Sequence, residues 1–168
     1  MTLADLEGFV REHQDMVYTT ALRLLGRKDE AQDMAQEAFL RALERRELLA
    51  GHENPGGWLR TVTTNLCLNH LERHRKRWRL FSELETEDGS AFEDTLAAPA
   101  PAEDSPAGLE AALLGLPDHQ RVPIILFHFE ELPYDEIARR LGVSLGKLKT
   151  DIFRGRAALR KALGEEAA

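Results

Sequence analysis

The stretch that most constrains the fold runs from Glu131 to Ala162, because it carries the signals of two helices joined by a tight turn. Pro133 stands just before the first helix, where a missing N–H costs little. Gly142 follows the last residue of an apolar repeat, as a helix-ending glycine does. Ser144 is a suitable N-cap for the next helix. The pattern predicts a short helix, a glycine-containing turn and a longer helix.

The second of these helices is predicted to have two different faces. One face carries aliphatic residues at helical spacing: Leu145, Leu148, Ile152, Leu159 and Leu163. The opposite face is mostly basic: Lys147, Lys149, Thr150, Phe153, Arg154, Arg160 and Lys161. This is the helix-turn-helix pattern, whose second helix enters the DNA major groove. The alternative is an ordinary αα-hairpin with a solvated basic face.

The net charge of −7 is concentrated in one segment of the 168 residues. Residues 1–80 hold 13 Lys and Arg against 12 Asp and Glu, and residues 111–168 hold nine against eight. Residues 81–110 hold nine Asp and Glu with no Lys or Arg. Two nearly neutral bodies are therefore joined by an acidic tether. The total charge alone does not argue against nucleic-acid binding by either body.

The cysteine count and hydropathy indicate a cytoplasmic protein. A single cysteine, Cys67, excludes an internal disulfide framework and fits a reducing compartment. There is no run of about 18 apolar residues and no secretory signal. We therefore expect neither a membrane span nor export.

The first body is predicted to begin with two amphipathic helices. Residues 2–25 form one, interrupted once near His13 and ending at Gly26, and residues 29–46 form the next. The residues expected to face inward on the second are Ala31, Met34, Ala35, Ala38, Phe39, Ala42 and Leu43. Its outward face combines an exposed leucine with acids and an amide: Asp33, Gln36, Glu37, Leu40 and Glu44. Such a face is either a protein-binding patch or a solvated surface with one stray leucine.

A loop over residues 47–57 is followed by a predicted helix over residues 58–79. Its inner stripe is expected to be Trp58, Leu59, Val62, Leu66 and Asn69. Its last turns are basic, with one aromatic residue among them: Arg73, His74, Arg75, Lys76, Arg77, Trp78 and Arg79. Cations favour a helix C-terminus through its dipole. Alternatively, these cations hold phosphates while Trp58 and Trp78 stack on unpaired bases.

Cys67, His70 and His74 share a helical face and resemble metal ligands in their spacing. However, seven residues of helix separate the first and last by about 10 Å, too far for one zinc ion bound at about 2.0–2.3 Å. No fourth ligand is evident. We therefore expect no metal or other cofactor, and a metal-dependent helical enzyme is kept only as an alternative.

The remaining segments complete an all-α fold of two small helical domains. We expect domains at residues 1–80 and 108–168, joined by an acidic linker, rich in alanine and proline, over residues 81–107. In the second domain, Leu109, Leu113, Leu114 and Leu116 precede Pro117. Its most apolar helix is expected to hold Val122, Ile124, Ile125, Leu126, Phe127 and Phe129, with Pro123 in the first turn.

Four stretches in this order resemble the extracytoplasmic-function (ECF) sigma factors of bacterial RNA polymerase. They are DEAQDMAQEAFLRAL (29–43), PGGWLRTVTTNLCLNHLERHRKR (55–77), LPDHQRVPIILFHFEEL (116–132) and LPYDEIARRLGVSLGKLKTDIFRGRAALRKAL (132–163). The resemblance covers nearly the whole chain. Each motif alone is loose, but four in the right order are specific.

The resemblance implies roles for individual residues. Core polymerase would be bound through Asp33, Gln36, Glu37 and Leu40. The promoter −10 element would be melted and read by His52, Asn54, Trp58, Arg60, Thr64, Asn65, Asn69, Arg73 and Arg77, with residues 52–54 capturing a flipped base. The −35 element would be read by Ser144, Lys147, Lys149, Thr150, Asp151 and Arg154.

The first residues of the helix that would read the −35 element (the reader helix) differ from the family pattern. Residues 146–151 read GKLKTD, where G-T-V-K-S-R is usual. Asp151 replaces an arginine that contacts DNA, and a carboxylate is repelled by phosphates although it can accept a hydrogen bond from a cytosine N4. The departure bears on which −35 sequence is read.

The resemblance implies a transcription initiation factor without catalytic activity, whose partners are core RNA polymerase, promoter DNA and an anti-sigma factor. The acidic linker would thread the basic RNA channel of the polymerase. A stand-alone helix-turn-helix repressor is the competing interpretation, and it predicts tight operator binding without polymerase. No Gly-rich phosphate loop or catalytic triad pattern supports an enzyme.

The acidic linker should weaken DNA binding by the free protein, because it repels phosphates and competes for the protein's own basic faces. Deletion of residues 83–106 is therefore expected to strengthen DNA binding, measured as the Kd of the free chain for duplex DNA. An unchanged Kd would contradict this competition.

Overall fold

The structure, a computed structural model, describes residues 3–73 and 108–164. The chain divides into two compact units after Leu71. Every regular element among the described residues is a helix, which confirms the predicted all-α class. The acidic linker and the basic stretch over residues 74–79, with His74, Arg77 and Trp78, lie outside the described residues.

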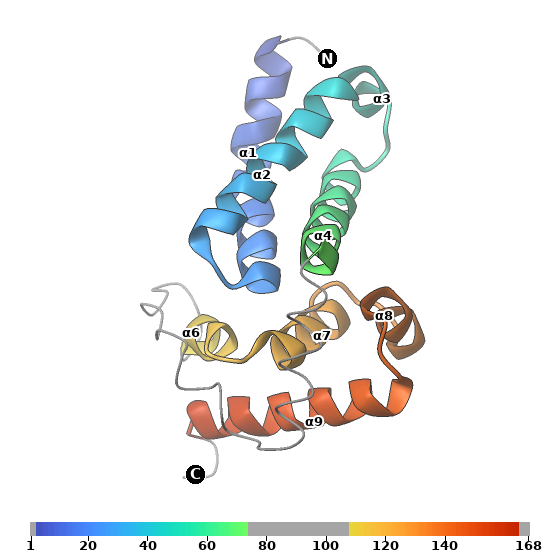
Figure 1. Ribbon diagram of the computed structural model, residues 1–168. Coiled ribbons are helices and arrows are strands. Elements are labelled where there is room, and N and C mark those ends of the chain that lie inside the picture. Colours follow the sequence, from blue (N-terminus) through green and yellow to red (C-terminus); the bar gives the residue numbers. More distant parts are fainter. Residues whose placement is uncertain (1–2, 74–107, 165–168) are drawn as a thin grey trace. The chain divides into compact units, whose positions relative to one another are not determined.

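The N-terminal unit contains four helices (Figure 1): α1 (Leu3–Leu25), α2 (Lys28–Glu44), α3 (Arg46–Ala50) and α4 (Pro55–Arg73). Gly26, with φ of 75°, ends α1 as predicted. The predicted interruption near His13 is wrong, because α1 is continuous there. The His13 Nδ1 lies 2.9 Å from the Phe9 carbonyl oxygen, one turn earlier. The short helix α3 was not predicted; turn residues surround it.

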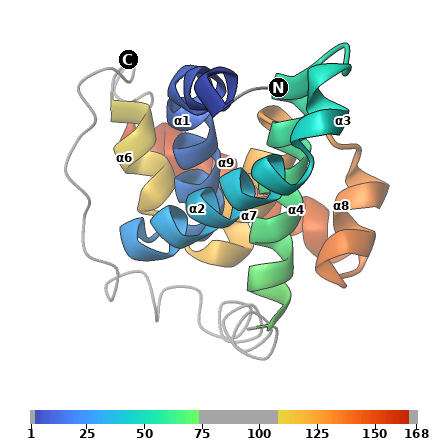
Figure 2. The ribbon, with the colours of Figure 1, turned by 90° about the horizontal axis from the view of Figure 1, so that it is seen from above.

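Small residues on α2 let α1 lie against it, and the two helices run side by side in Figures 1 and 2. Ala31, Ala38 and Ala42 are fully buried. The core of this unit draws on all four helices: Phe9, Val17, Ala38, Ala42, Leu49, Leu59 and Leu66. Leu43 is 38 % exposed, so its predicted inward orientation is wrong.

The buried face of α4 differs from the predicted stripe. Asn69 is exposed, whereas Thr63 and Cys67 are fully buried. The Thr63 hydroxyl donates to the Leu59 carbonyl at 2.8 Å, so its polar group is satisfied within the helix. A threonine can therefore line this core at little cost, which apolar periodicity alone does not reveal.

The C-terminal unit contains α6 (Leu109–Leu114), α7 (Asp118–His128), α8 (Tyr134–Leu141) and α9 (Leu145–Ala162). Its buried hydrophobic residues include Leu113, Leu116, Val122, Ile124, Ile125, Leu126, Ile137, Leu148 and Ile152, and polar or charged residues are buried as well: His119, Gln120, Arg121 and Asp151. Pro123 lies in the second turn of α7, because this helix begins at Asp118. The prediction that placed Pro123 in the first turn is wrong.

The turn between α8 and α9 has the predicted chemistry. Gly142 has φ of 70° and donates its N–H to the Arg139 carbonyl at 3.3 Å, while Val143 donates to the Ala138 carbonyl at 3.1 Å. This pair of bonds is the Schellman arrangement of a glycine-ended helix. The Ser144 hydroxyl accepts the Lys147 N–H at 3.1 Å and caps α9.

Helix α9 packs closely on α7 at Gly155, and the two helices lie side by side in Figure 1. A Cβ at Gly155 would lie 2.5 Å from the Ile124 Cδ1 and 3.3 Å from the Gln120 Cβ. Leu148 and Ile152 are buried on the same side. Leu145, predicted to face inward, is 43 % exposed instead. The inward side of α9 is therefore set by Leu148, Ile152 and Gly155.

Gly155→Ala should destabilise the C-terminal unit, although alanine favours a helix by about 1 kcal/mol. The new methyl group overpacks the α7 contact, which costs about 1–3 kcal/mol, so we expect a net loss on the order of 1 kcal/mol. Hydrogen exchange of the α7 and α9 amides in the full chain measures this loss of stability. Gly146→Ala is the matched control, since nothing lies within 4 Å of the position that its new methyl group would take. Equal protection in both variants would contradict the packing explanation.

Candidate functional site

Among the described residues, the large hydrophobic side chains that are exposed lie in two places only. Leu40, Leu43 and Leu48 lie on the last turns of α2 and on α3, and Leu145 and Phe153 lie on α9. Exposed apolar groups that cluster beside charged residues are typical of surfaces that bind other macromolecules. The two clusters belong to different units, so each unit has its own candidate surface.

The outward face of α2 carries the predicted protein-binding residues. Asp33, Gln36 and Glu44 are exposed, Leu40 is 50 % exposed, and Glu37 is half-buried. Glu37 pairs with Arg41 at 3.6 Å across one helical turn. An apolar anchor with a polar rim is thus present on one helix face, opposite the buried alanines.

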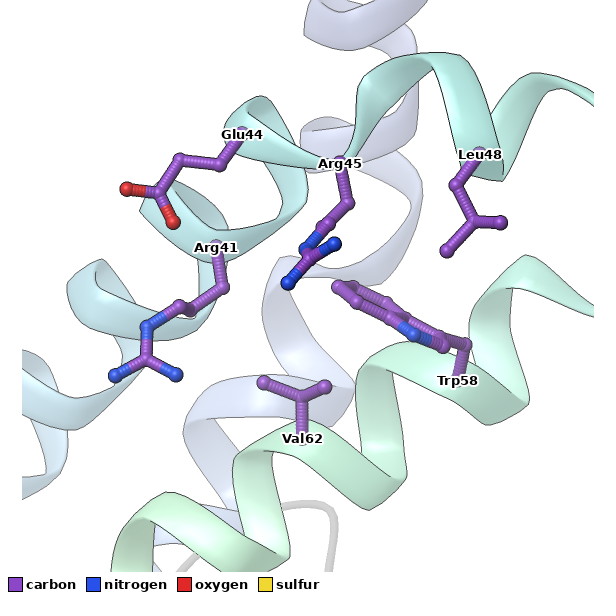
Figure 3. A pocket seen from close by; sticks show the side chains of 6 residues that line it. All are labelled: Arg41, Glu44, Arg45, Leu48, Trp58 and Val62. Atoms are coloured by element: carbon purple, nitrogen blue, oxygen red, sulfur yellow. The ribbon is translucent and has the colours of Figure 1, made fainter.

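A pocket of about 330 Å³ lies beside this face, where α2, α3 and α4 meet (Figure 3). Its lining side chains are Arg41, Glu44, Arg45, Leu48, Trp58 and Val62. Figure 3 shows the Arg45 and Leu48 side chains directed toward the Trp58 ring. Trp58 also packs against the core of the unit and is half-buried, so its open side faces this pocket. Sequence reasoning missed Arg45, because an arginine in a run of charges carries no distinct signal.

The loop before α4 is held by two short-range hydrogen bonds. The His52 Nδ1 accepts the Asn54 N–H at 2.9 Å, and the Asn54 Oδ1 accepts the Gly57 N–H at 3.0 Å. Asn54 therefore caps α4. Because the His52 Nδ1 is an acceptor, the ring proton of the neutral imidazole lies on Nε2. His52 and Asn54 are exposed, so the loop presents polar groups in a fixed arrangement.

The predicted DNA-contacting residues of α4 do not share one face. At 100° per residue, Trp58, Asn65, Asn69 and Arg73 lie along one line of the helix. Asn69 and Arg73 are exposed at its C-terminal end. The remaining two residues, Arg60 and Thr64, lie on the opposite side, and Thr64 is 6 % exposed. Thr64, which the resemblance assigned to the −10 element, is therefore buried within its unit.

His70 has a structural partner on α2. Its Nε2 lies 2.8 Å from the Glu30 Oε1, and Glu30 also pairs with Arg27 at 3.1 Å. Cys67 is buried. Within the described part of the chain, no group of three or more His, Cys, Asp or Glu side chains could hold a metal ion. His74 lies outside it.

The outward face of α9 combines cations with polar and aromatic side chains. Lys149, Thr150 and Arg154 are exposed, as the sequence predicted, and Ser144 is exposed at the N-cap. Phe153 shares this face and is 68 % exposed. Phe153 was not among the predicted DNA contacts, although an aromatic residue on the basic face was a visible signal. This face can contact both phosphates and base edges.

Asp151 does not belong to the outward face. Its side chain is 2 % exposed, and its Oδ1 accepts a hydrogen bond from the Lys147 Nζ at 2.8 Å. Burial raises the pKa of the Asp151 carboxyl, while Lys147 and Arg154 oppose that rise. This placement corrects the expectation that Asp151 faces a duplex. Lys147 is one-quarter exposed at the edge of the face.

Two histidines of α7 lie near α9. Burial, together with the nearby Lys147 and Arg154, lowers the pKa of His119 to about 4 despite the opposing Asp118. Burial and Arg156 also lower the pKa of His128. The Arg156 Nη2 lies 2.9 Å from the His128 Nε2, and its guanidinium lies 5.8 Å from the centre of the Phe127 ring. These contacts fix the middle of α9 to the end of α7.

Comparison with known proteins identifies the two units. Residues 9–77 match the family model of sigma-70 region 2, and residues 107–159 match that of sigma-70 region 4. A solved structure of the sigma factor RpoE from Bartonella quintana, in complex with the anti-sigma factor NepR, has a TM-score of 0.53. It is 25 % identical and covers 96 % of this chain and 98 % of that chain.

The curated relatives are named sigma factors. The ECF RNA polymerase sigma factor SigW of Bacillus subtilis is 33 % identical over 90 % of this chain and 84 % of its own length. The ECF RNA polymerase sigma factor SigE of Mycolicibacterium smegmatis is 38 % identical over 95 % of this chain. The match covers 62 % of that longer relative.

A helical unit matching sigma-70 region 2, followed by a helix-turn-helix unit matching region 4, defines a sigma-70-type transcription factor. The resemblance seen in the sequence is thereby confirmed. The chain belongs to the ECF sigma factors of bacterial RNA polymerase. None of the described helices is long and apolar enough to cross a membrane.

The buried His119 makes the C-terminal unit sensitive to acid. The folded state keeps its ring neutral down to about pH 4, whereas the unfolded chain protonates it near its usual pKa of 6.5. The contribution of the neutral His119 ring to the free energy of unfolding should be fully present above pH 6.5. It should be lost as the pH falls from 6.5 to 4, by an amount on the order of 3 kcal/mol.

The difference between wild type and His119→Gln isolates this effect from the titration of carboxylates. Hydrogen exchange of the α7 amides in the full chain, from about pH 7 to about pH 4.5, should show a smaller loss of stability in the variant. Equal losses in both proteins would contradict the linkage. An NMR titration of the His119 ring provides a direct check, with a midpoint expected near pH 4.

Proposed function

We propose that the N-terminal unit docks on core RNA polymerase through the outward face of α2. Asp33, Gln36, Glu37 and Leu40 are the proposed contacts, and the resemblance to the family assigns this role to matching positions. The observation that carries the proposal is the clustering of exposed leucines on α2 and α3, beside acids. A central apolar side chain with a charged rim is the usual anatomy of a binding hot spot.

The same unit is proposed to hold the melted −10 element. Asn65, Asn69 and Arg73 lie along one side of α4 and suit an unpaired strand, with the cation at a phosphate and the amides at base edges. The loop from His52 to Asn54 is proposed to capture a flipped base. Its two internal hydrogen bonds support this role, because a loop already ordered loses less entropy on binding.

The C-terminal unit is proposed to lay α9 in the major groove of the −35 element. Lys149 and Arg154 are suited to phosphates or guanine edges, and Thr150 to the edge of any base. We add Phe153, whose exposed ring is suited to the methyl group of a thymine. Burial of this ring against a base would remove apolar surface from water, which is favourable.

The activity as a whole is proposed to be regulatory rather than catalytic, and to take place in the cytoplasm with the polymerase. We also propose an anti-sigma protein as a partner, because the structurally similar sigma factor RpoE was solved bound to one. A stand-alone repressor remains the second candidate. It requires tight operator binding without polymerase, which nothing in the described part of either unit specifically favours.

Run-off transcription with core polymerase and a genomic promoter library tests these roles. The double variant Asp33→Ala/Glu37→Ala should bind core polymerase at least roughly thirtyfold more weakly, because two hot-spot truncations that each cost more than about 1 kcal/mol sum to more than about 2 kcal/mol. Glu12→Ala/Asp15→Ala is the matched control, since it removes two acids from α1. Similar polymerase Kd values for both double variants would exclude the proposed α2 contacts.

Arg154→Ala should reduce promoter-dependent initiation on the order of tenfold, since a lost base or phosphate contact costs about 1–3 kcal/mol. Its polymerase affinity should be unchanged. Arg139→Ala, which removes an exposed arginine from α8, is the control in the same unit. If initiation were reduced equally by both arginine variants, α9 would lose its proposed role as reader.

A further inference from the structure

The ion pair between Lys147 and Asp151 differs from the ion pair on the neighbouring helix α8. Lys147 and Asp151 lie one turn apart on α9, with side chains 25 % and 2 % exposed. Glu136 and Arg139 on α8 form a pair at 2.6 Å with side chains 30 % and 69 % exposed. The first pair is largely withdrawn from water, whereas the second is solvated and contributes little.

Lys147 stands at the border of the outward face. At 100° per residue it lies about 60° from Thr150 around the helix, whereas Asp151 lies about 100° from Thr150. A lysine at that border has a side chain long enough to reach a phosphate. The 2.8 Å contact with Asp151 instead directs its ammonium toward a buried carboxylate.

The surroundings leave Lys147 as the main compensating charge for Asp151. Asp151 is buried, and the other cation that acts on it is Arg154, whose side chain is exposed. A buried carboxylate without its partner is strongly unfavourable, so the pair should persist when α9 meets DNA. The exposed cations left on the first three turns of α9 are then Lys149 and Arg154.

We infer that Asp151 is a positioning residue that keeps the Lys147 ammonium away from DNA. Lys147 then neutralises a buried charge rather than a phosphate, and the −35 element is contacted by Lys149, Thr150, Phe153 and Arg154. The loss of one phosphate contact lowers the affinity for non-specific DNA, so base contacts supply a larger share of the binding free energy. This inference rests on the proposed role of α9 as the reader helix.

The test is the salt dependence of DNA binding by the full chain. Fluorescence anisotropy with a labelled duplex of random sequence, about 20 base pairs long, in about 20 to 200 mM KCl, gives the slope of log K against log salt. Asp151→Asn should release Lys147 and make the slope steeper by about 0.9, the value of one phosphate contact. Affinity at low salt should rise several-fold.

Two variants separate release of Lys147 from a simple change in net charge. Glu136→Gln removes one carboxylate charge from the same unit without freeing Lys147, and its slope should equal that of wild type. Lys147→Met/Asp151→Asn should return the slope to the wild-type value. An Asp151→Asn slope equal to that of wild type or of Glu136→Gln would overturn the inference.

Lys147→Met/Asp151→Leu keeps the test decisive if Asp151→Asn does not fold, since an apolar replacement of a buried pair is often tolerated. It should keep the wild-type slope, and a slope flatter by about 0.9 would show that Lys147 contacts phosphate and would overturn the inference. Arg154→Ala distinguishes failure of the proposed reader role: if its Kd equals that of wild type, α9 does not bind the duplex. Circular dichroism of each variant confirms folding.

Discussion

The contact between α7 and α9 at Gly155 determines which side of α9 is available to a partner. With no side chain at this position, Ile124 and Gln120 of α7 approach the α9 backbone. Leu148 and Ile152 are then buried on the same side. Because a helix is a rigid object with a fixed angle per residue, fixing one line on its surface fixes all the others. The outward orientation of Thr150 and Arg154 is therefore a consequence of this packing.

The N-terminal unit uses the same principle on α2. Fully buried alanines at positions 31, 38 and 42 let α1 come close, and the opposite side of the helix carries Asp33, Gln36 and Leu40. In both units a line of small or aliphatic residues decides which polar residues remain outside. The helix that carries the candidate contacts is in each case held by a neighbouring helix, so the contacts are presented on a rigid element.

Local signals in the sequence predicted the helix ends better than the helix faces. The end of α8 at Gly142 and the cap at Ser144 follow from hydrogen bonds within a few residues, which the sequence specifies directly. The buried face of α4 cannot be predicted from such local hydrogen bonds. Thr63 satisfies its hydroxyl on the helix itself and is buried, whereas Asn69, which was predicted to lie inside, is exposed. Asp151 on α9 shows the same limit, since its carboxylate is buried, and residue periodicity contains no information on the contacts that permit this.

The Lys147–Asp151 pair is not a product of helix preferences. A lysine in the first turn opposes the helix dipole, and a lysine placed four residues before an acid has the less favourable order. The pair is instead imposed by the packing that buries Asp151: burial disfavours the charged carboxylate, and the Lys147 ammonium offsets that cost at a position where water screens the attraction less. Under the role proposed for α9, the charge that this helix presents to DNA is therefore set by how α9 packs within its unit. A change in that packing, with no change in the reader helix, would alter the electrostatics of recognition.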